Sequence, residues 1–367
     1  MALFGDNPMP PLGRRTRGGK TGWTVLGIAF AAGLILAIAP APYAIEKPGP
    51  VYNTLGTAEH EGKQIPLITI PDKTVYPTEG SLDMLTVSLV GNPEQRPTWL
   101  EVATAWADPS SAVIPIDKAF PANVSTEQRD AANQAAMVNS QQDAIAAALT
   151  HLGYDYPTTI SVVSLPKTSP AAGIVKASDQ VTSVNGKEVA NITELRKALK
   201  ASGAGTPATL GILRDGVAQD LSVTPVEVAG NVVVGINVRM DYDFPFSVQI
   251  QLDRVGGPSA GMMFSLGIID KLTPGAIQGG AHVAGTGTID ESGEVGPIGG
   301  IRQKLFGAKN AGADWFLAPA DNCDEVTGHI PDGLTVFAVK TLDDSLAALE
   351  AIRSDADTTA LATCPAS

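Results

Sequence analysis

The sequence Gly256-Gly257-Pro258-Ser259-Ala260-Gly261 joins two segments of contrasting pattern. Before it, Phe246–Leu252 alternates apolar and polar residues, which predicts a half-buried β-strand. After it, Met262–Ile269 is apolar almost all round, which predicts a buried helix. Ser259 would then lie on a glycine-lined turn at a helix N-terminus, where unpaired backbone N–H groups and the helix dipole stabilise an oxyanion. Alternatively, the serine only caps the helix and the glycines only serve the turn. This stretch alone leaves both interpretations open.

Lys304 is the best downstream candidate for a base, which a serine hydroxyl needs to become a good nucleophile. Gly299–Gly312 reads as a helix, and Lys304 falls inside its apolar stripe, which consists of Ile301, Leu305 and Ala308. Because a buried ammonium group is costly, the pKa of the lysine would have to fall from about 10.4 to about 7 for it to be neutral there. A neutral amine would suit the activation of Ser259. Alternatively, the side chain keeps its amine in water.

Three segments in this order resemble the proteolytic domain of Lon proteases: Gly257–Gly261, Thr286–Gly287 and Gly296–Lys304. The resemblance extends over roughly residues 228–345. It implies a fold of the Lon proteolytic type and a serine peptidase activity.

The resemblance also implies roles for individual residues. Lon proteases use a Ser-Lys dyad, so it implies that Ser259 is the nucleophile and Lys304 the general base. Thr286 matches the threonine that helps to position the lysine. One departure concerns the supporting polar groups: ATP-dependent Lon enzymes usually have a Lys-Asp pair before the Gly-Pro-Ser, whereas this chain has Val255–Gly256.

The N-terminal region reads as a membrane anchor. Residues 1–20 form a basic tail with a single acid, Asp6, and the basic residues Arg14, Arg15, Arg17 and Lys20. Residues 21–45 are uncharged and mostly apolar, which predicts a transmembrane helix over 21–43, since about 20 residues span a bilayer. Basic residues before this helix and Glu46 after it predict a cytoplasmic N-terminus and extracytoplasmic C-terminal domains. The alternative is a cleaved signal peptide with its site at Ala39–Ala41.

Composition limits the class of partner and cofactor. The formal net charge is −13 and the pI about 4.7, which argues against nucleic acid. The chain has only two cysteines, Cys323 and Cys364, which either form a disulfide in an oxidising compartment or remain two unrelated thiols. Cys323 with His329 is too sparse a set for a metal site. We therefore expect neither a metal nor another cofactor.

Residues 48–156 are expected to form the N-terminal part of the peptidase region. Gln64–Ile70 and Leu82–Val90 read as strands, and Ala131–Leu152 reads as an alanine-rich helix. Pro109–Val124 reads as a loop that could cover the site. Residues 80–87 also resemble the first strands of a Lon proteolytic domain. The hypothesis is that this region shares one fold with Ser259 and that another domain is inserted between them.

The inserted segment, residues 158–227, resembles a bacterial PDZ domain. Strand patterns, a strong hairpin turn at Asn185–Gly186 and an amphipathic helix over Ile192–Ala201 support this interpretation. PDZ domains bind extended peptides or C-termini by strand addition, so a peptide partner is implied; alternatively, the module is structural and binds no ligand. Gly153–Tyr156 is the candidate for its carboxylate-binding loop.

From residue 228 to residue 354 the pattern is that of the proteolytic domain. Strands are expected over Val232–Val238, Val283–Ile289, Trp315–Pro319 and Leu334–Val339, followed by a short helix over 342–352. Alternating strands and helices indicate an α/β or α+β fold. Residues 355–367 read as a polar tail.

The whole chain resembles the membrane-anchored, PDZ-containing Lon-like proteases of bacteria. The resemblance implies an ATP-independent endopeptidase acting on extracytoplasmic proteins or peptides, and a homo-oligomer, because Lon proteolytic domains assemble into rings. Two other interpretations remain. An α/β-hydrolase would use Ser259 with His329 and an acid, Asp321 or Asp324. A non-catalytic membrane scaffold would use the PDZ domain alone.

Overall fold

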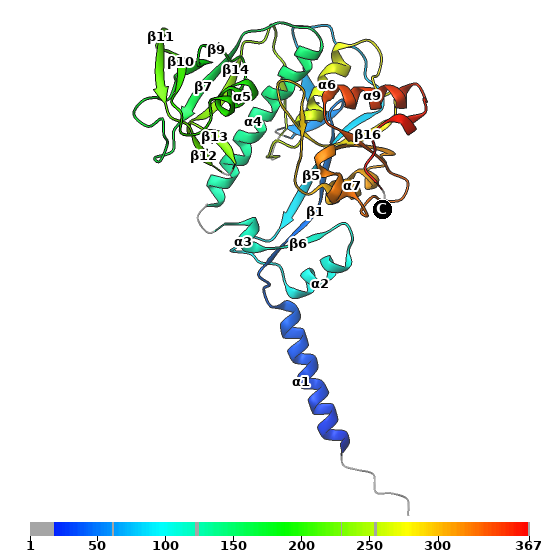
Figure 1. Ribbon diagram of the computed structural model, residues 1–367. Coiled ribbons are helices and arrows are strands. Elements are labelled where there is room, and N and C mark those ends of the chain that lie inside the picture. Colours follow the sequence, from blue (N-terminus) through cyan, green and yellow to red (C-terminus); the bar gives the residue numbers. More distant parts are fainter. Residues whose placement is uncertain (1–17, 61, 122–124, 229, 253–254, 366–367) are drawn as a thin grey trace, which may run out of the picture. The chain divides into compact units, whose positions relative to one another are not determined.

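The structure is a computed structural model that describes residues 18–60, 62–121, 125–228, 230–252 and 255–365 (Figure 1). Most of the expected basic tail, including Arg14, Arg15 and Arg17, lies outside these ranges, as do the last two residues of the expected polar tail. The chain divides into two compact units. The first comprises Met1–Glu46 and Leu89–Ala122, and the second comprises Lys47–Ser88 and Asn123–Ser367.

The first unit contains the N-terminal helix α1 and a small cluster of elements. In chain order these are α1 (Gly18–Ile38), the start of β1 (Tyr43–Asn53), α2 (Trp99–Ala107), β6 (Ala112–Pro115) and α3 (Ile116–Ala119). β6 pairs antiparallel with the first residues of β1 over a core of Ala41, Ile45, Val102 and Ala105. The segment expected to be a loop over 109–124 therefore contains a strand and a helical turn. Residues 89–122, which were expected within the N-terminal part of the peptidase region, group with this unit.

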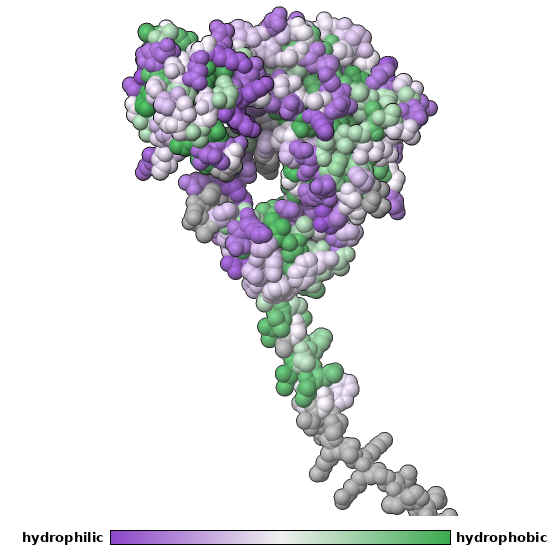
Figure 2. Space-filling model, in the orientation of Figure 1, coloured by the Kyte–Doolittle hydropathy of each residue, from purple (hydrophilic) through white to green (hydrophobic). Residues whose placement is uncertain are grey.

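The large apolar side chains of α1 are exposed, as the green surface in Figure 2 shows. Trp23, for example, is 77% exposed. Among the residues that the structure describes, no helix combines the length and the apolar character that a membrane crossing requires. The transmembrane helix expected over 21–43 is therefore not confirmed.

The second unit is built on a mixed sheet in the order β20-β19-β16-β5-β1. β16 pairs parallel with β5 and with β19, and β19 pairs parallel with β20. The bounds of these strands are β5 (Ser81–Val90), β16 (His282–Gly285), β19 (Trp315–Pro319) and β20 (Thr335–Val339). Short strands complete this part: β2 (Thr57–His60), β3 (Lys63–Pro66), β4 (Ile68–Thr69), β15 (Gln249–Ile250), β17 (Thr288–Ile289) and β18 (Val295–Gly296).

Helix α6 forms the centre of the main hydrophobic core. Ten consecutive residues of it, Gly261–Asp270, are buried, as its continuous apolar sequence predicts. It packs against the long helix α4, which begins five residues earlier than expected because Ser125 and Gln128 form a capping box there. The helices of this part are α4 (Thr126–His151), α6 (Gly261–Leu272), α7 (Ile301–Asn310), α8 (Cys323–Val326) and α9 (Leu342–Arg353), with 3₁₀ turns η1 (Ala320–Asn322) and η2 (Thr358–Ala360).

Two expected strands are much shorter than their patterns suggested. Of Phe246–Leu252 only β15 is a strand, and it pairs with β4. Upstream of β15, Phe246 packs its ring edge-on against Tyr154 instead of joining a ladder. The strand expected over 64–70 is divided into β3 and β4 because β3 ends at Pro66, which has no N–H to donate.

A second sheet has the order β11-β10-β8-β7-β14, and β9 pairs with β8. Its elements are β7 (Thr158–Ser164), β8 (Gln180–Val184), β9 (Lys187–Glu188), α5 (Ile192–Ser202), β10 (Ala208–Arg214), β11 (Val217–Val223), the hairpin β12 (Val226–Val228) and β13 (Asn231–Val233), and β14 (Asn237–Tyr242). β14 pairs with β7, so this sheet extends beyond the boundary expected at residue 227. The strand expected over Val232–Val238 is divided, because Val232–Val233 belong to β13 and Asn237–Val238 to β14, in which Val238 is opposite the buried Val162 of β7.

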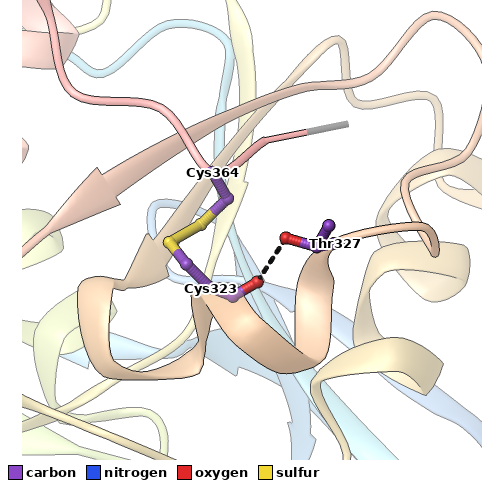
Figure 3. The surroundings of a disulfide bond; sticks show 3 residues. All are labelled: Cys323, Thr327 and Cys364. Carbon is purple, nitrogen blue, oxygen red and sulfur yellow. Dashed lines mark hydrogen bonds between the residues drawn. A yellow bond between two sulfur atoms is a disulfide. The ribbon is translucent and has the colours of Figure 1, made fainter. Parts of the chain in front are cut away.

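Cys323 and Cys364 form a disulfide with a Cα–Cα distance of 5.0 Å (Figure 3). The sequence left this pairing open. Cys364 also lies in a short extended segment along β20, in which its N–H donates to the carbonyl of Val336 at 3.1 Å. Part of the expected polar tail therefore packs on the sheet.

A fragment of residues 228–367 is expected not to fold, because it lacks β1 and β5 of the main sheet and the helix α4 that covers α6. Thermal unfolding followed by circular dichroism would test this, with the chain from residue 46 as the control. A cooperative transition of the fragment alone would contradict the sheet order described above.

Candidate active site

Ser259 lies on a tight loop immediately before α6, whose N-cap residue is Ala260. Gly257 has φ +87°, a left-handed conformation that favours glycine. Gly256 has no room for a side chain, because a Cβ atom would meet the Cβ of Asn133 on α4 at 2.9 Å. The glycines flanking Ser259 are thus required by backbone conformation and by close packing.

Lys304 reaches Ser259 from α7. Ile301, Leu305 and Ala308 are fully buried, so the predicted apolar stripe faces the core and carries Lys304 with it. The lysine side chain is 2% exposed, and its Nζ lies 2.8 Å from Oγ of Ser259. Burial lowers the pKa of Lys304 to about 7. Near neutral pH a substantial fraction of this amine is therefore uncharged.

Thr286 fixes the direction of the lysine amine. It follows β16, is fully buried, and its hydroxyl donates to the carbonyl of Ser259 at 2.9 Å. Its single proton is used there, so the oxygen accepts a hydrogen bond from Nζ of Lys304, also at 2.9 Å. A neutral Lys304 then has a lone pair available for the Ser259 proton. The residues expected from the sequence are thus brought together in one contact network.

The loop that carries Ser259 has two backbone N–H groups without a hydrogen-bond acceptor among the described residues. Among the described residues, neither the N–H of Ser259 nor that of Ala260 makes a hydrogen bond. The carbonyl of Ser259, in contrast, accepts from the N–H of Gly287 at 3.0 Å. Adjacent free N–H groups beside a serine hydroxyl are the arrangement that stabilises an oxyanion.

A pocket of about 490 Å³ opens beside Ser259 and Lys304. Its apolar lining includes Tyr52, Leu85, Val255 and two flexible methionines, Met84 and Met137. Such a lining suits an apolar side chain of variable shape.

One side of β5 is unpaired at this pocket. β16 pairs with β5 only from Ser81 to Met84. The following residues, from Leu85 to Ser88, line the pocket, and within the described chain no strand covers that side of them. An extended peptide could add to this edge and place a carbonyl at Ser259.

The alternative triad is not assembled. Nδ1 of His329 lies 3.0 Å from the carbonyl of Thr327, and Lys304 is the only hydrogen-bond partner of the Ser259 hydroxyl within the described ranges. In the same part of the chain, no three His, Cys, Asp or Glu side chains lie close enough together to hold a metal ion.

The second sheet carries a groove of about 430 Å³ between α5 and residues 232–238. Its apolar wall includes Ile192, Leu195 and Leu199. Gly153–Tyr156, the candidate carboxylate-binding loop, does not line this groove. Gly235, which has φ +70°, lines the groove between the apolar residues Val234 and Ile236.

Comparison with known proteins supports two domains. Residues 254–351 match the profile of the Lon protease (S16) C-terminal proteolytic domain, and residues 132–224 match that of the PDZ domain. The chain therefore contains both domains, which confirms the coarse expectation from the sequence.

Similar curated proteins are Lon proteases. Lon protease 1 of Sorangium cellulosum is 37% identical over 101 residues, which cover 27% of this chain and 12% of the relative. Lon protease 1 of Bacillus subtilis is 30% identical over 118 residues, which cover 30% of this chain and 15% of the relative. The chain thus spans only a small part of these relatives. Among solved structures, the PDZ domain of an SdrC-like protein from Listeria innocua is 21% identical, with a TM-score of 0.21, and covers 22% of this chain and 92% of that one.

Replacement of Lys304 by Met is expected to stabilise the fold at pH 7. In the folded state the lysine pKa is lowered from 10.5 to about 7, so the unfolded chain binds more protons between these values. The resulting destabilisation is full below pH 7, is lost as the pH rises to 10.5, and amounts to about 5 kcal/mol at most. Thermal melts at pH 7 and pH 10 should show a gain that shrinks with pH. Lys309→Met, on the same helix, is the control, and an equal gain in both variants would contradict the assignment.

Proposed function

We propose that this chain is a membrane-anchored, ATP-independent serine endopeptidase with a Ser-Lys dyad. The observation that supports it most directly is the 2.8 Å contact between the buried amine of Lys304 and the hydroxyl of Ser259. The Lon-type proteolytic domain in residues 254–351 agrees with the same chemistry. A non-catalytic scaffold would not need this contact or the buried lysine.

The proposed reaction starts with the transfer of the Ser259 proton to the neutral amine of Lys304. Oγ of Ser259 attacks the scissile carbonyl carbon, and the oxyanion forms beside the N–H groups of Ser259 and Ala260. The lysine ammonium returns its proton to the leaving amine as the peptide C–N bond breaks, which leaves an ester on Ser259. Lys304 then takes a proton from water, whose oxygen attacks the ester. As the ester C–O bond breaks, the lysine ammonium returns this proton to Oγ of Ser259, and the acid is released.

Substrates are proposed to be flexible or unfolded segments of proteins. They would bind in extended form along the free edge of β5 and place an apolar side chain in the pocket lined by Met84 and Met137. The groove between α5 and residues 232–238 would take a peptide or a C-terminus and deliver the substrate.

We propose that the chain is anchored by a single span, with a cytoplasmic N-terminus and extracytoplasmic domains. The uncharged, largely apolar sequence of residues 21–45 and the exposed apolar side chains of α1 support this. The Cys323–Cys364 disulfide suits an oxidising compartment. A homo-oligomer is also proposed, by analogy with the rings of Lon proteolytic domains.

Cleavage of unfolded casein without ATP should require the dyad and not His329. Ser259→Ala and Lys304→Ala are expected to lower the rate by about 10³-fold or more, because each removes a group that moves in the reaction. His329→Ala should retain activity, since its ring contacts the carbonyl of Thr327. Loss of activity with His329→Ala and its retention with Lys304→Ala would favour the triad instead.

The dependence of kcat/KM on pH should follow the titration of Lys304. Because neutral Lys304 is the base and its pKa is about 7, kcat/KM is expected to rise about tenfold per pH unit below pH 7 and to level off above it. The measurement uses a fluorogenic peptide between pH 5 and pH 9. A profile that is flat from pH 5 to pH 8 would rule out this base.

A further inference from the structure

Helix α4 holds the nucleophile loop through two hydrogen bonds from a distant part of the sequence. The hydroxyl of Ser140 donates to the carbonyl of Pro258 at 2.9 Å. About two turns earlier, the carbonyl of Asn133 accepts from the N–H of Gly257 at 2.9 Å. Ser140 is only 2% exposed, so its hydroxyl does not exchange this bond with bulk water.

The glycines of the loop allow α4 to come this close. A Cβ atom on Gly261 would meet Oγ of Ser140 at 2.8 Å, and one on Gly256 would meet Asn133 at 2.9 Å. Both distances are shorter than real side-chain contacts. The absence of side chains at these glycines therefore lets the loop pack against α4, and the Ser140 bond is part of that contact.

The Ser140 bond sets the direction of a free N–H group. In a trans peptide unit the N–H points opposite to the preceding carbonyl, and the described chain contains no cis bonds. Holding the Pro258 carbonyl toward α4 therefore turns the N–H of Ser259 away from α4. In the same way, the bonds from Thr286 and Gly287 to the Ser259 carbonyl turn away the N–H of Ala260. These are the two N–H groups without an acceptor.

We propose that Ser140 is a positioning residue that aims the N–H of Ser259 at the oxyanion. This inference rests on the proposed peptidase function. Without the hydroxyl, the Pro258 carbonyl loses its side-chain donor, and the peptide unit between Pro258 and Ser259 is no longer held in one orientation. The N–H of Ser259 then leaves the position that the developing charge requires. The hydrogen bond from the N–H of Ser259 to the oxyanion is strongest in the transition state. Its loss therefore lowers kcat and leaves KM nearly unchanged.

Ser265 provides a matched control. It is fully buried between the same two helices, and its hydroxyl donates to the carbonyls of Ala144 and Gly261 at 2.9 and 3.2 Å. Ser265→Ala therefore removes a buried hydroxyl that joins α6 to α4 without freeing the Pro258 carbonyl. The two variants should have similar melting temperatures and different kinetics.

The experiment compares the full chain in detergent as wild type, Ser140→Ala, Ser140→Thr and Ser265→Ala. It measures kcat and KM on a fluorogenic peptide, and the affinity of a peptide boronate, which forms a tetrahedral adduct on serine. For Ser140→Ala we expect kcat to fall by roughly 10- to 100-fold, KM to stay within about twofold and boronate affinity to fall in parallel with kcat. Ser265→Ala should stay within about threefold of wild type, and Ser140→Thr, which keeps the hydroxyl, should recover most of the rate.

Equal kcat values for Ser140→Ala and Ser265→Ala, or a change in KM alone, would overturn the inference while leaving the peptidase function intact. A wild-type chain that neither cleaves the peptide nor binds the boronate would overturn both. If Ser140→Ala does not fold, Ser140→Cys replaces it: a weaker donor should give a partial loss of kcat, and unchanged kcat would count against the proposal.

Discussion

The burial of one amine beside one hydroxyl is the constraint on which the site depends. An ammonium group at the position of Lys304 would lose its hydration, and among the described residues no carboxylate pairs with it, so burial lowers its pKa. The amine is therefore tolerated because it can be neutral and because two hydroxyls, from Ser259 and Thr286, satisfy it. The same property that makes the lysine costly for folding makes it a base at neutral pH.

The site is assembled from parts of the chain that are far apart in sequence. Ser259 precedes α6, Thr286 follows β16, Lys304 belongs to α7, and α4 holds the loop from the other side. Each element is positioned by the core rather than by the site itself, because α6 is buried along ten residues and α7 carries its own apolar stripe. Packing thus places the reactive atoms, and the hydrogen bonds orient them.

The sequence predicted the side chains of the site better than their surroundings. Lys304 could be found because helix periodicity places it on a buried face, and Ser259 because the glycines around it need unusual backbone conformations. The contribution of Asn133 could not be found, because it acts through a carbonyl that every residue possesses. Ser140 lies in an alanine-rich helix whose pattern shows amphipathic character but not which helix or loop it faces.

Strand partners were harder to predict than strands. The apolar run Val232–Val238 was predicted as one strand, but its pattern does not say which strands it pairs with. It is divided between β13, which pairs with β12, and β14, which pairs with β7 rather than with the peptidase sheet. The aromatic segment around Phe246 was misread because ring packing also produces alternating burial. The separation of residues 89–122 from the rest of their region depends on contacts between distant segments, which local patterns do not contain.

The segment around Cys364 also covers one edge of the main sheet. β20 is the last strand on its side, and an uncovered edge strand is a template for pairing with other chains. Here the carbonyl of Ala362 and the N–H of Cys364 occupy its outer edge, and the bond to Cys323 fastens them there. The disulfide thus helps to keep this edge strand covered. As long as this disulfide is intact, the covered edge of β20 is not free to pair with a strand of another chain.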